Sequence, residues 1–474
     1  TNTHTHTHAH TQDAFESAHA WNPVMSIKDF IYTQVVKELE YEQWRNSTNP
    51  YNNVDKCAEY LASSHHPEFE TVQVNRYQWS FSNGIYRAKE DAFFPFAERL
   101  HWPAIAAKLT ADRRAIDPAY VGTVAPTHLD VSIKYFDLPF PFDIVNEDHA
   151  SFDPRRIALP SLDKILNDQK LDQDTIDALK FLMGRMLFEV GFFEAWQVFV
   201  FVKGRAGSGK STLAKVMRAF LPPHLVSTLS SNIEQKFGLS AIYESYLCIC
   251  PEVKSDFGLS QGELQSAVSG EEMSIPIKNK TAVASWKWVT NFLFCGNELP
   301  AWKNSQGSVD RRIAMVEFNE KVRGGDPKLF DKLLLEAPSM LRCIVCCYMR
   351  AVKLFGHKDI WAPGVLPKQM HHFRDNVRRS VDILVAFLDS ECFDFDETYY
   401  MPLEDFKAQY SDYRKRDGLE RVRWSKDHYG AVFNDYGLRI QKETKEWGGK
   451  KETAHFVYGL RSVDEDDGGD AAMP

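Results

Sequence analysis

The chain has 474 residues, 44% of them hydrophobic, which is enough for two or three domains with cores of their own. No apolar run approaches the roughly 18 residues that cross a membrane, and the first residues lack the apolar core of a secretory signal. We therefore expect an intracellular protein with no membrane partner. The net charge of −9 offers no general attraction for nucleic acid, although a ring-shaped assembly can confine positive charge to a narrow channel.

The region between residues 13 and 160 mixes helical and strand patterns. Residues 26–44 predict a helix, while 72–81 and 85–88 predict the strands of a hairpin joined by a Ser-Asn-Gly turn. Proline recurs from residue 118 to 160, which indicates extended connecting segments.

A strand, a glycine-rich turn and a helix follow one another in the middle of the chain. After two helices predicted over residues 162–190, the apolar run 196–203 predicts a buried strand, and 212–221 has helical spacing. Between them, Gly204–Ser211 (GRAGSGKS) fits G-x-x-x-x-G-K-[ST] without a gap. Such a loop surrounds a phosphate chain with backbone N–H groups at a helix N-terminus, so this stretch predicts a nucleotide site.

In a site of this kind, Lys210 reaches the β- and γ-phosphates and Ser211 gives its hydroxyl to Mg²⁺. ATP and Mg²⁺ are therefore the expected cofactors. The residues predicted to line the phosphates are Gly204, Ala206, Gly207, Ser208, Gly209, Lys210, Ser211 and Thr212.

A second apolar run, residues 246–250, predicts a strand that ends at Pro251-Glu252. A P-loop ATPase carries a carboxylate at this place, on the edge of the sheet beside the phosphates. We expect Glu252 to polarise the attacking water and to hold Mg²⁺, with Asp256 as a weaker alternative. A solvated acid at a strand end is the competing interpretation.

A third predicted strand, residues 288–295, is followed by Asn297, whose amide either orients water against the γ-phosphate or caps the next turn. Arg311 and Arg312 come directly before an apolar strand. In a ring ATPase this position supplies an arginine to the γ-phosphate of the neighbouring subunit. The alternative is a solvated turn.

Residues 264–280 predict a short helix, a glycine turn and a β-hairpin with Lys278 and Lys280 at its tip. In a ring, this tip would point into the pore and contact the phosphates of a DNA strand. An ordinary exposed hairpin, with lysines for solubility, is the alternative.

Taken in order, these motifs resemble superfamily 3 helicases, and more narrowly the helicase portion of the poxvirus-type primase-helicases of large DNA viruses, phages and plasmids. GRAGSGKS is similar to their A motif, YLCICPE to their B motif, LQSAVSGEEMSIPIKNK to their B′ segment, NFLFCGN to their C motif and DRRIAMVEF to their arginine-finger turn. The resemblance is strong over residues 196–320. Phe81–Tyr86 is more loosely similar to an f-x-N-G-v-y hairpin upstream of the ATPase.

The resemblance implies a hexameric ring that threads DNA through its pore and unwinds it 3′–5′ with ATP. It assigns catalytic roles to Lys210, Glu252, Asn297, Arg311 and Arg312, metal contacts to Ser211 and Glu252, and DNA contacts to Lys278 and Lys280. Pro251 departs from the family, which commonly has a second acid there, so Mg²⁺ coordination would depend more on Ser211 and water. No hydrophobic-Asp-hydrophobic-Asp primase pair precedes residue 160, so the primase is expected in a longer protein or on a separate chain.

The C-terminal part predicts a separate small domain, with helices over 377–390, 403–416 and 426–436 and a hairpin from 438–441 to 455–458. Three helices and a hairpin are typical of a winged helix, which the resemblance also implies at this place. A basic cluster around Trp424 suits nucleic acid, docking to other replication proteins or simple solvation; it comprises Arg414, Lys415, Arg416, Arg421, Arg423 and Lys426.

The predicted fold is α/β: an AAA+-like P-loop ATPase core with a mixed α+β N-terminal region and a C-terminal winged-helix-like domain. The predicted segments are a disordered tail (1–12), the N-terminal mixed region with its hairpin (13–160), a helical collar (161–195), the ATPase core (196–322), a helical extension (323–374), the winged-helix-like domain (375–462) and a disordered acidic tail (463–474).

We interpret the chain as an ATP-dependent DNA helicase that acts as a homo-hexamer on single-stranded or forked DNA, with a primase and other replisome proteins as partners. The resemblance favours the replication site of a virus or phage, in the host cytoplasm or nucleus. One alternative is an ATPase for DNA packaging or replication initiation without processive unwinding. Another is a small-molecule kinase, which would have no use for a lysine-tipped hairpin or an arginine pair at a subunit edge.

Overall fold

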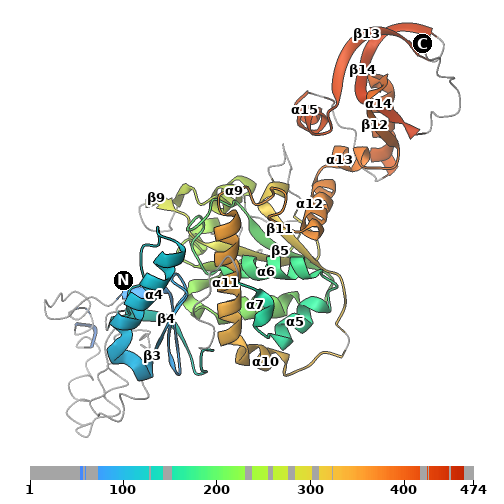
Figure 1. Ribbon diagram of the computed structural model, residues 1–474. Helices are drawn as coiled ribbons and strands as arrows, with labels where there is room; N and C mark the ends of the chain where they lie inside the picture. Colours follow the sequence, from blue (N-terminus) through green and yellow to red (C-terminus); the bar gives the residue numbers. More distant parts are fainter. Residues whose placement is uncertain are drawn as a thin grey trace.

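The structure is a computed structural model with a mixed α/β fold, in which an N-terminal sheet, a central α/β body and a C-terminal module follow one another (Figure 1). No helix among the described residues is long and apolar enough to cross a membrane. The helix predicted over 26–44 lies outside the described residues, which are 54–56, 59, 73–127, 130–141, 152–229, 238–254, 260–275, 283–300, 309–322, 324–416, 424, 426–447 and 450–463.

A five-stranded sheet forms the centre of the body, in the order β11-β5-β10-β7-β6, with every neighbouring pair parallel. Its strands are apolar along most of their length because helices cover both faces of a parallel sheet. This sheet confirms the predicted α/β class. The strands are β5 (Phe199–Gly204), β6 (Val226–Thr228), β7 (Leu247–Val253), β10 (Asn291–Gly296) and β11 (Ile313–Phe318).

Helices from both sides of the motif region surround this sheet. The two helices expected before β5 are present, and α6 packs closely on the much later α11, because Gly184 has no side chain: a Cβ there would lie 2.0 Å from the Ile344 carbonyl oxygen. The helices are α5 (Pro160–Asn167), α6 (Gln173–Arg185), α7 (Lys210–Ala219), α9 (Gln261–Val268), α10 (Leu329–Leu335), α11 (Ala337–Phe355) and α12 (Lys368–Val381).

Short elements complete the body. An antiparallel pair of strands, β8 (Glu272–Ile275) and β9 (Val283–Lys287), forms the predicted hairpin, although its tip lies outside the described residues. Single 3₁₀ turns occur at η3 (Pro154–Arg156), η4 (Pro223–Leu225), η5 (Gly238–Ala241) and η7 (Asp310–Arg312).

The N-terminal sheet has the order β3-β2-β1-β4, with β1 (Gln73–Phe81) and β2 (Gly84–Arg87) forming the predicted hairpin. Four further elements were not predicted as such: β3 (Ala92–Pro95), η1 (Phe96–His101), α4 (Trp102–Ile116) and β4 (Asp130–Phe136). The stretch 118–160, predicted as extended connecting segments, contains the strand β4, which pairs in parallel with β1, and the 3₁₀ turn η3.

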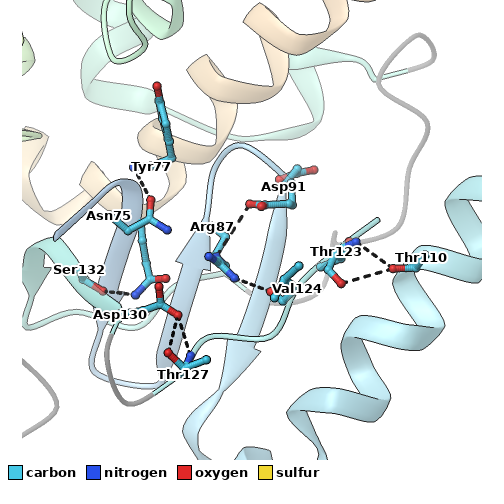
Figure 2. Close-up of polar contacts among 12 residues, drawn as sticks. Asn75, Tyr77, Arg87, Asp91, Thr110, Thr123, Val124, Thr127, Asp130 and Ser132 are labelled. Atoms are coloured by element: carbon cyan, nitrogen blue, oxygen red, sulfur yellow. Dashed lines mark hydrogen bonds and ion pairs between the residues drawn. The ribbon is translucent and has the colours of Figure 1, made fainter. Parts of the chain in front are cut away.

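The segment that leads into β4 is tied to the sheet by backbone carbonyls and hydroxyls, as Figure 2 shows. Arg87 donates to the Val124 carbonyl, and the Thr110 hydroxyl of α4 accepts from the backbone N–H of Thr123 at 2.8 Å. Asp130 accepts from the backbone N–H of Thr127 at 2.7 Å as β4 begins. These hydrogen bonds hold the segment between α4 and β4, whose described residues have no regular secondary structure, in place.

The Asn-Gly turn of the hairpin has a structural role. The Asn83 side chain both donates to the Phe140 carbonyl (3.0 Å) and accepts from the Phe140 backbone N–H (2.8 Å). A Cβ on Gly84 would lie 2.6 Å from the Phe94 carbonyl oxygen, so only glycine fits beside β3. The hairpin is thereby fixed to the segment after β4.

The N-terminal sheet packs directly on the central body. The Trp79 indole donates to the carbonyl of Phe220 at 2.8 Å, just after α7, and Arg76 donates to the carbonyl of Phe188 at 3.0 Å. Trp79 and the apolar residues of the central sheet belong to one hydrophobic core. The C-terminal end of α7 is therefore held by a sheet that begins more than a hundred residues earlier.

The C-terminal module has its own hydrophobic core and stands apart from the body beyond α12 (Figure 1). The helix predicted over 377–390 is in fact broken, because Asp382 accepts from the backbone N–H of Leu384 and starts a new helix there. A strand that was not predicted, β12, pairs with β14. The elements are α13 (Ile383–Leu388), β12 (Phe393–Pro402), α14 (Leu403–Arg416), α15 (Lys426–Asp435), β13 (Arg439–Trp447) and β14 (Lys450–Ser462).

Candidate nucleotide site

The glycine loop, Gly204–Ser211, connects the end of β5 to the start of α7, as the motif predicts. Gly207 and Gly209 have φ angles of +77° and +101°, a region that other residues rarely adopt, and α7 begins at Lys210 directly afterwards. The first backbone N–H groups of α7 have no partner within the helix, and the helix N-terminus carries partial positive charge. The loop therefore has the geometry of an anion site.

Lys210 is buried, and its ammonium group is held by three oxygens. It donates to the carbonyls of Gly204 (2.5 Å) and Arg205 (2.7 Å) and to the Asn297 side-chain oxygen (3.1 Å). Burial lowers the pKa of Lys210, and the nearby Cys295 partly opposes that shift. Two predicted site residues that are far apart in the sequence, Lys210 and Asn297, are thus in direct contact.

The strand order explains this contact. β10 lies between β5 and β7, and its last residue, Gly296, pairs with Lys203 of β5 and with Val253 of β7. Asn297 therefore leaves the sheet at the same edge as the glycine loop. We call this the carboxyl edge, because the strands β5, β7 and β10 all end there.

Glu252 lies at the carboxyl edge too, one residue before Val253. Its side chain is exposed and makes no hydrogen bond or ion pair with any residue that the structure describes. Pro251 is also exposed. The alternative acid, Asp256, lies outside the described residues.

The remaining loop residues differ in exposure: Ser208 is buried, Thr212 is half-buried, and Ala206 and Ser211 are exposed. Hydroxyl and carboxylate oxygens are the ligands that Mg²⁺ prefers, and Mg²⁺ usually keeps several waters. Ser211 and Glu252 therefore fit that ion in type and exposure. Among the described residues there is no cluster of three His, Cys, Asp or Glu that could hold a metal by itself.

Arg311 and Arg312 lie at the opposite end of the sheet, in η7, which we call the arginine turn (Asp310–Arg312). The register pairs Ile313 with Phe199 and Phe318 with Gly204, so the turn is separated from the glycine loop by the full length of β5 and β11. At about 3.3 Å per residue this is about 17 Å. Within one chain, the structure does not bring the arginines to Lys210.

The two arginines also differ from each other. Arg311 is exposed, whereas Arg312 is 9% exposed and its guanidinium lies 3.5 Å from the Ser269 hydroxyl. Desolvation and the neighbouring charge of Arg311 lower the pKa of Arg312. Of the pair, Arg311 is the one whose side chain faces solvent.

Residues outside the motifs brace the arginine turn. The Trp361 indole donates to the Arg311 carbonyl (2.7 Å), and Arg374 of α12 forms an ion pair with the buried Asp310 (3.2 Å). The Arg374 guanidinium also lies over the Trp361 ring. The sequence carries no spacing signal for these contacts, because their partners lie 50 and 64 residues further along the chain.

The predicted DNA contacts are described only in part. Lys278 and Lys280 lie outside the described residues, as do Arg421 and Arg423. Trp424, which was predicted to lie inside a basic cluster, stacks on Tyr429 and packs against the core of the C-terminal module. It is therefore engaged in packing within its own module.

The sequence profile of a family of unknown function (DUF5906) matches residues 202–312, from within β5 to the end of the arginine turn. Among solved structures, the chain is similar to the A-form apo structure of the NrS-1 C-terminal region, with a TM-score of 0.41 and 13% identity over 81% of this chain and 96% of that one. It is also similar to the apo structure of the NrS-1 C-terminal region (305–718), with a TM-score of 0.37 and 12% identity over the same shares. No curated protein matches.

Proposed function

We propose that the chain is an ATP-dependent DNA helicase of a replication primase-helicase, which translocates 3′–5′ on single-stranded DNA as a hexameric ring. The observation that carries the proposal is the division of the candidate site between two ends of one sheet. The carboxyl edge holds Lys210, Asn297 and Glu252, while the arginine turn lies about 17 Å away. A site that needs both ends is completed only by a second subunit.

At the carboxyl edge, each residue has a role that its position supports. The glycine loop and Lys210 bind the phosphates of ATP, and Ser211 and Glu252 hold Mg²⁺, which offsets phosphate charge when bound. Glu252, exposed and without a partner among the described residues, accepts the proton of the attacking water. Asn297, already in contact with Lys210, orients that water against the γ-phosphate.

The arginine turn serves the neighbouring subunit. Arg311 faces solvent, and its turn is braced by Trp361, so the side chain projects from a fixed base. A cation placed in this way stabilises the charge that develops during phosphoryl transfer, a contribution of about 10³–10⁵ in rate in related chemistry. Closed rings provide one such boundary for every subunit.

The DNA would pass through the ring, with Lys278 and Lys280 of the β8–β9 tip on its phosphates. The C-terminal module supports a role on nucleic acid or in docking: its order is helix, strand, two helices and hairpin, which suits a winged helix. A primase and other replisome proteins are the proposed partners, at the replication site of a virus or phage inside the host cell.

The main alternative is a ring ATPase for DNA packaging or replication initiation, which shares every residue of the site but needs no processive unwinding. Strand displacement from a forked DNA separates the two functions. A small-molecule kinase is less well supported, because it would have no use for a lysine-tipped hairpin or for an arginine pair at a subunit edge.

The first experiment is ATP hydrolysis with and without single-stranded DNA, on wild type, Lys210→Ala and the double variant Arg311→Ala/Arg312→Ala. Both variants should lose hydrolysis alone, yet a 1:1 mixture should regain about a quarter of the wild-type sites, because an intact Lys210 can then face an intact arginine turn. Mixtures that stay inactive would exclude arginines acting between subunits. Hydrolysis that ignores DNA in a monomer would refute the helicase.

A further inference from the structure

The glycine loop is held by two contacts with residues that lie beyond the motif. The backbone N–H of Val322, just after β11, donates to the Gly207 carbonyl at 3.1 Å. The Gln169 amide, in the turn between α5 and α6, donates to the Ser208 carbonyl at 3.0 Å. Two successive carbonyls of the loop are thus each fixed by a donor.

These contacts determine which way the loop presents its N–H groups. A peptide unit is planar and trans, so its C=O and the following N–H point in opposite directions. Because Val322 and Gln169 hold the carbonyls of Gly207 and Ser208, the N–H groups of Ser208 and Gly209 point away from these two donors. That orientation is the one an anion-binding loop requires.

Gln169 is suited to this task because its side-chain amide is held by hydrogen bonds at both the nitrogen and the oxygen. It is 4% exposed, and besides Ser208 it donates to the Glu320 carbonyl (3.1 Å) and accepts from the Glu320 backbone N–H (3.0 Å). Lys170 and Glu320 form an ion pair at 2.6 Å on the exposed side. The same side chain therefore joins the glycine loop to the segment that follows β11.

We propose that Gln169 is a positioning residue of the nucleotide site, which orients the loop N–H groups toward the phosphates of a nucleoside triphosphate. The inference rests on the proposed function, since it concerns the same site. It adds a residue outside the matched family segment, which begins only at residue 202. The loop is thereby set before the nucleotide arrives, and less of the binding free energy is spent on ordering it.

The test compares Gln169→Met, which keeps the volume but removes the three hydrogen bonds, with Gln169→Glu, which keeps the acceptor but sets a carboxylate against two carbonyls. Gln173→Met is the matched control, because Gln173 is exposed and its side chain, among the residues that the structure describes, bonds only to Asp177 on the same helix. The measurements are the Kd of a fluorescent ATP analogue, KM and kcat for ATP hydrolysis, and Tm.

We expect the Kd and KM of Gln169→Met to rise about tenfold with kcat nearly unchanged, as when uniform ground-state and transition-state binding is lost. Gln169→Glu should bind more weakly still, and the control should match wild type. A lower Tm with unchanged Kd and KM, measured well below Tm, would show a merely structural residue and overturn the inference.

If the Gln169 variants do not fold, Val322→Pro tests the same loop, because proline lacks the backbone N–H that donates to the Gly207 carbonyl. Val322→Ala keeps that N–H and is the control. KM for ATP should rise about tenfold for Val322→Pro alone, and equal KM values for the two variants would overturn the inference. Two results for the wild-type protein separate this inference from the proposed function. A wild type that binds the ATP analogue but does not displace a DNA strand would refute the helicase and leave the role of Gln169 in place. A wild type that binds no ATP analogue would refute both.

Discussion

Gly204, the first glycine of the motif, should be needed for packing between strands, although its φ is ordinary. A Cβ added there would lie 2.0 Å from the Phe318 carbonyl oxygen, and real Cβ contacts are essentially never closer than 3.0 Å. The obstacle is backbone of the paired strand β11, which has no rotamer to change. Gly204→Ala must therefore push β5 and β11 apart by about 1 Å, in a sheet whose strands lie about 4.8 Å apart.

Overpacking of this kind costs typically about 1–3 kcal/mol. Alanine in a strand itself regains roughly 0.5–1 kcal/mol relative to glycine. We therefore expect a net loss of about 1–2 kcal/mol in the free energy of unfolding. Because the Gly204 carbonyl accepts from Lys210, the same shift should also raise KM for ATP.

Urea denaturation followed by fluorescence measures the change, with Gly325→Ala as the control because a Cβ there meets nothing within 4 Å. The denaturation midpoint of Gly204→Ala should fall, and that of the control should stay within error of wild type. A Gly204→Ala protein as stable as wild type, with unchanged KM, would refute the close approach of β5 and β11.

Three further predictions concern Arg185, Asn297 and Cys295. Arg185→Met should lower the free energy of unfolding by about 3–5 kcal/mol in urea denaturation, because it leaves the buried Glu194 carboxylate without a cation, with only the Trp196 N–H and the Tyr348 hydroxyl as donors among the described residues. A loss below about 1 kcal/mol, the range of an exposed ion pair, would contradict this. Asn297→Asp should raise KM for ATP about tenfold, since a carboxylate 3.1 Å from Lys210 competes with phosphate for its charge; an unchanged KM would count against the contact. Burial raises the pKa of Cys295 to about 12 from its usual 9.0, so its thiol should resist alkylation at pH 9 in the folded protein, as mass spectrometry can show. As the pH rises, the unfolded chain loses the Cys295 proton before the folded protein does. The buried thiol therefore lowers stability only at high pH: its contribution to the free energy of unfolding is complete below pH 9 and is lost as the pH rises toward 12.

Four of the five strands of the central sheet, β5, β7, β10 and β11, were predictable because each is largely a short apolar run, whereas the three-residue strand β6 was not predicted. The run before Gly204 and the run before Glu252 both became strands close to the expected bounds. In the C-terminal module, the 403–416 helix was also predictable, since it has helical spacing between clear breaks. In these segments local pattern and tertiary packing agree.

Other elements carried no local signal. β4 lies in a proline-rich stretch and forms a strand only because β1 offers a parallel partner from far along the chain. The acidic strand β12 is mostly exposed, so it lacks the alternation of a half-buried strand. The helix over 377–390 looked continuous because the cap formed by Asp382 is a side-chain geometry and not a change in periodicity.

The candidate site divides in the same way. The motif spacing identified Lys210 and Asn297, and the structure adds that they touch. Gln169 and Trp361 could not be found from the sequence, because each donates to a backbone carbonyl. Every residue has such a carbonyl, so the residue type of the acceptor gives no indication of the contact. Contacts of this kind are recognisable only once the chain has been folded.

The position of β11 at the edge of the sheet determines where the chain can be shortened for expression. The segment matched by the family profile ends at Arg312, one residue before β11 begins. A fragment cut there would leave β5 as a bare, apolar edge strand, a template for aggregation, and would remove the Val322 donor to the loop. A fragment meant to keep the arginine turn in place must extend through Trp361 and Arg374.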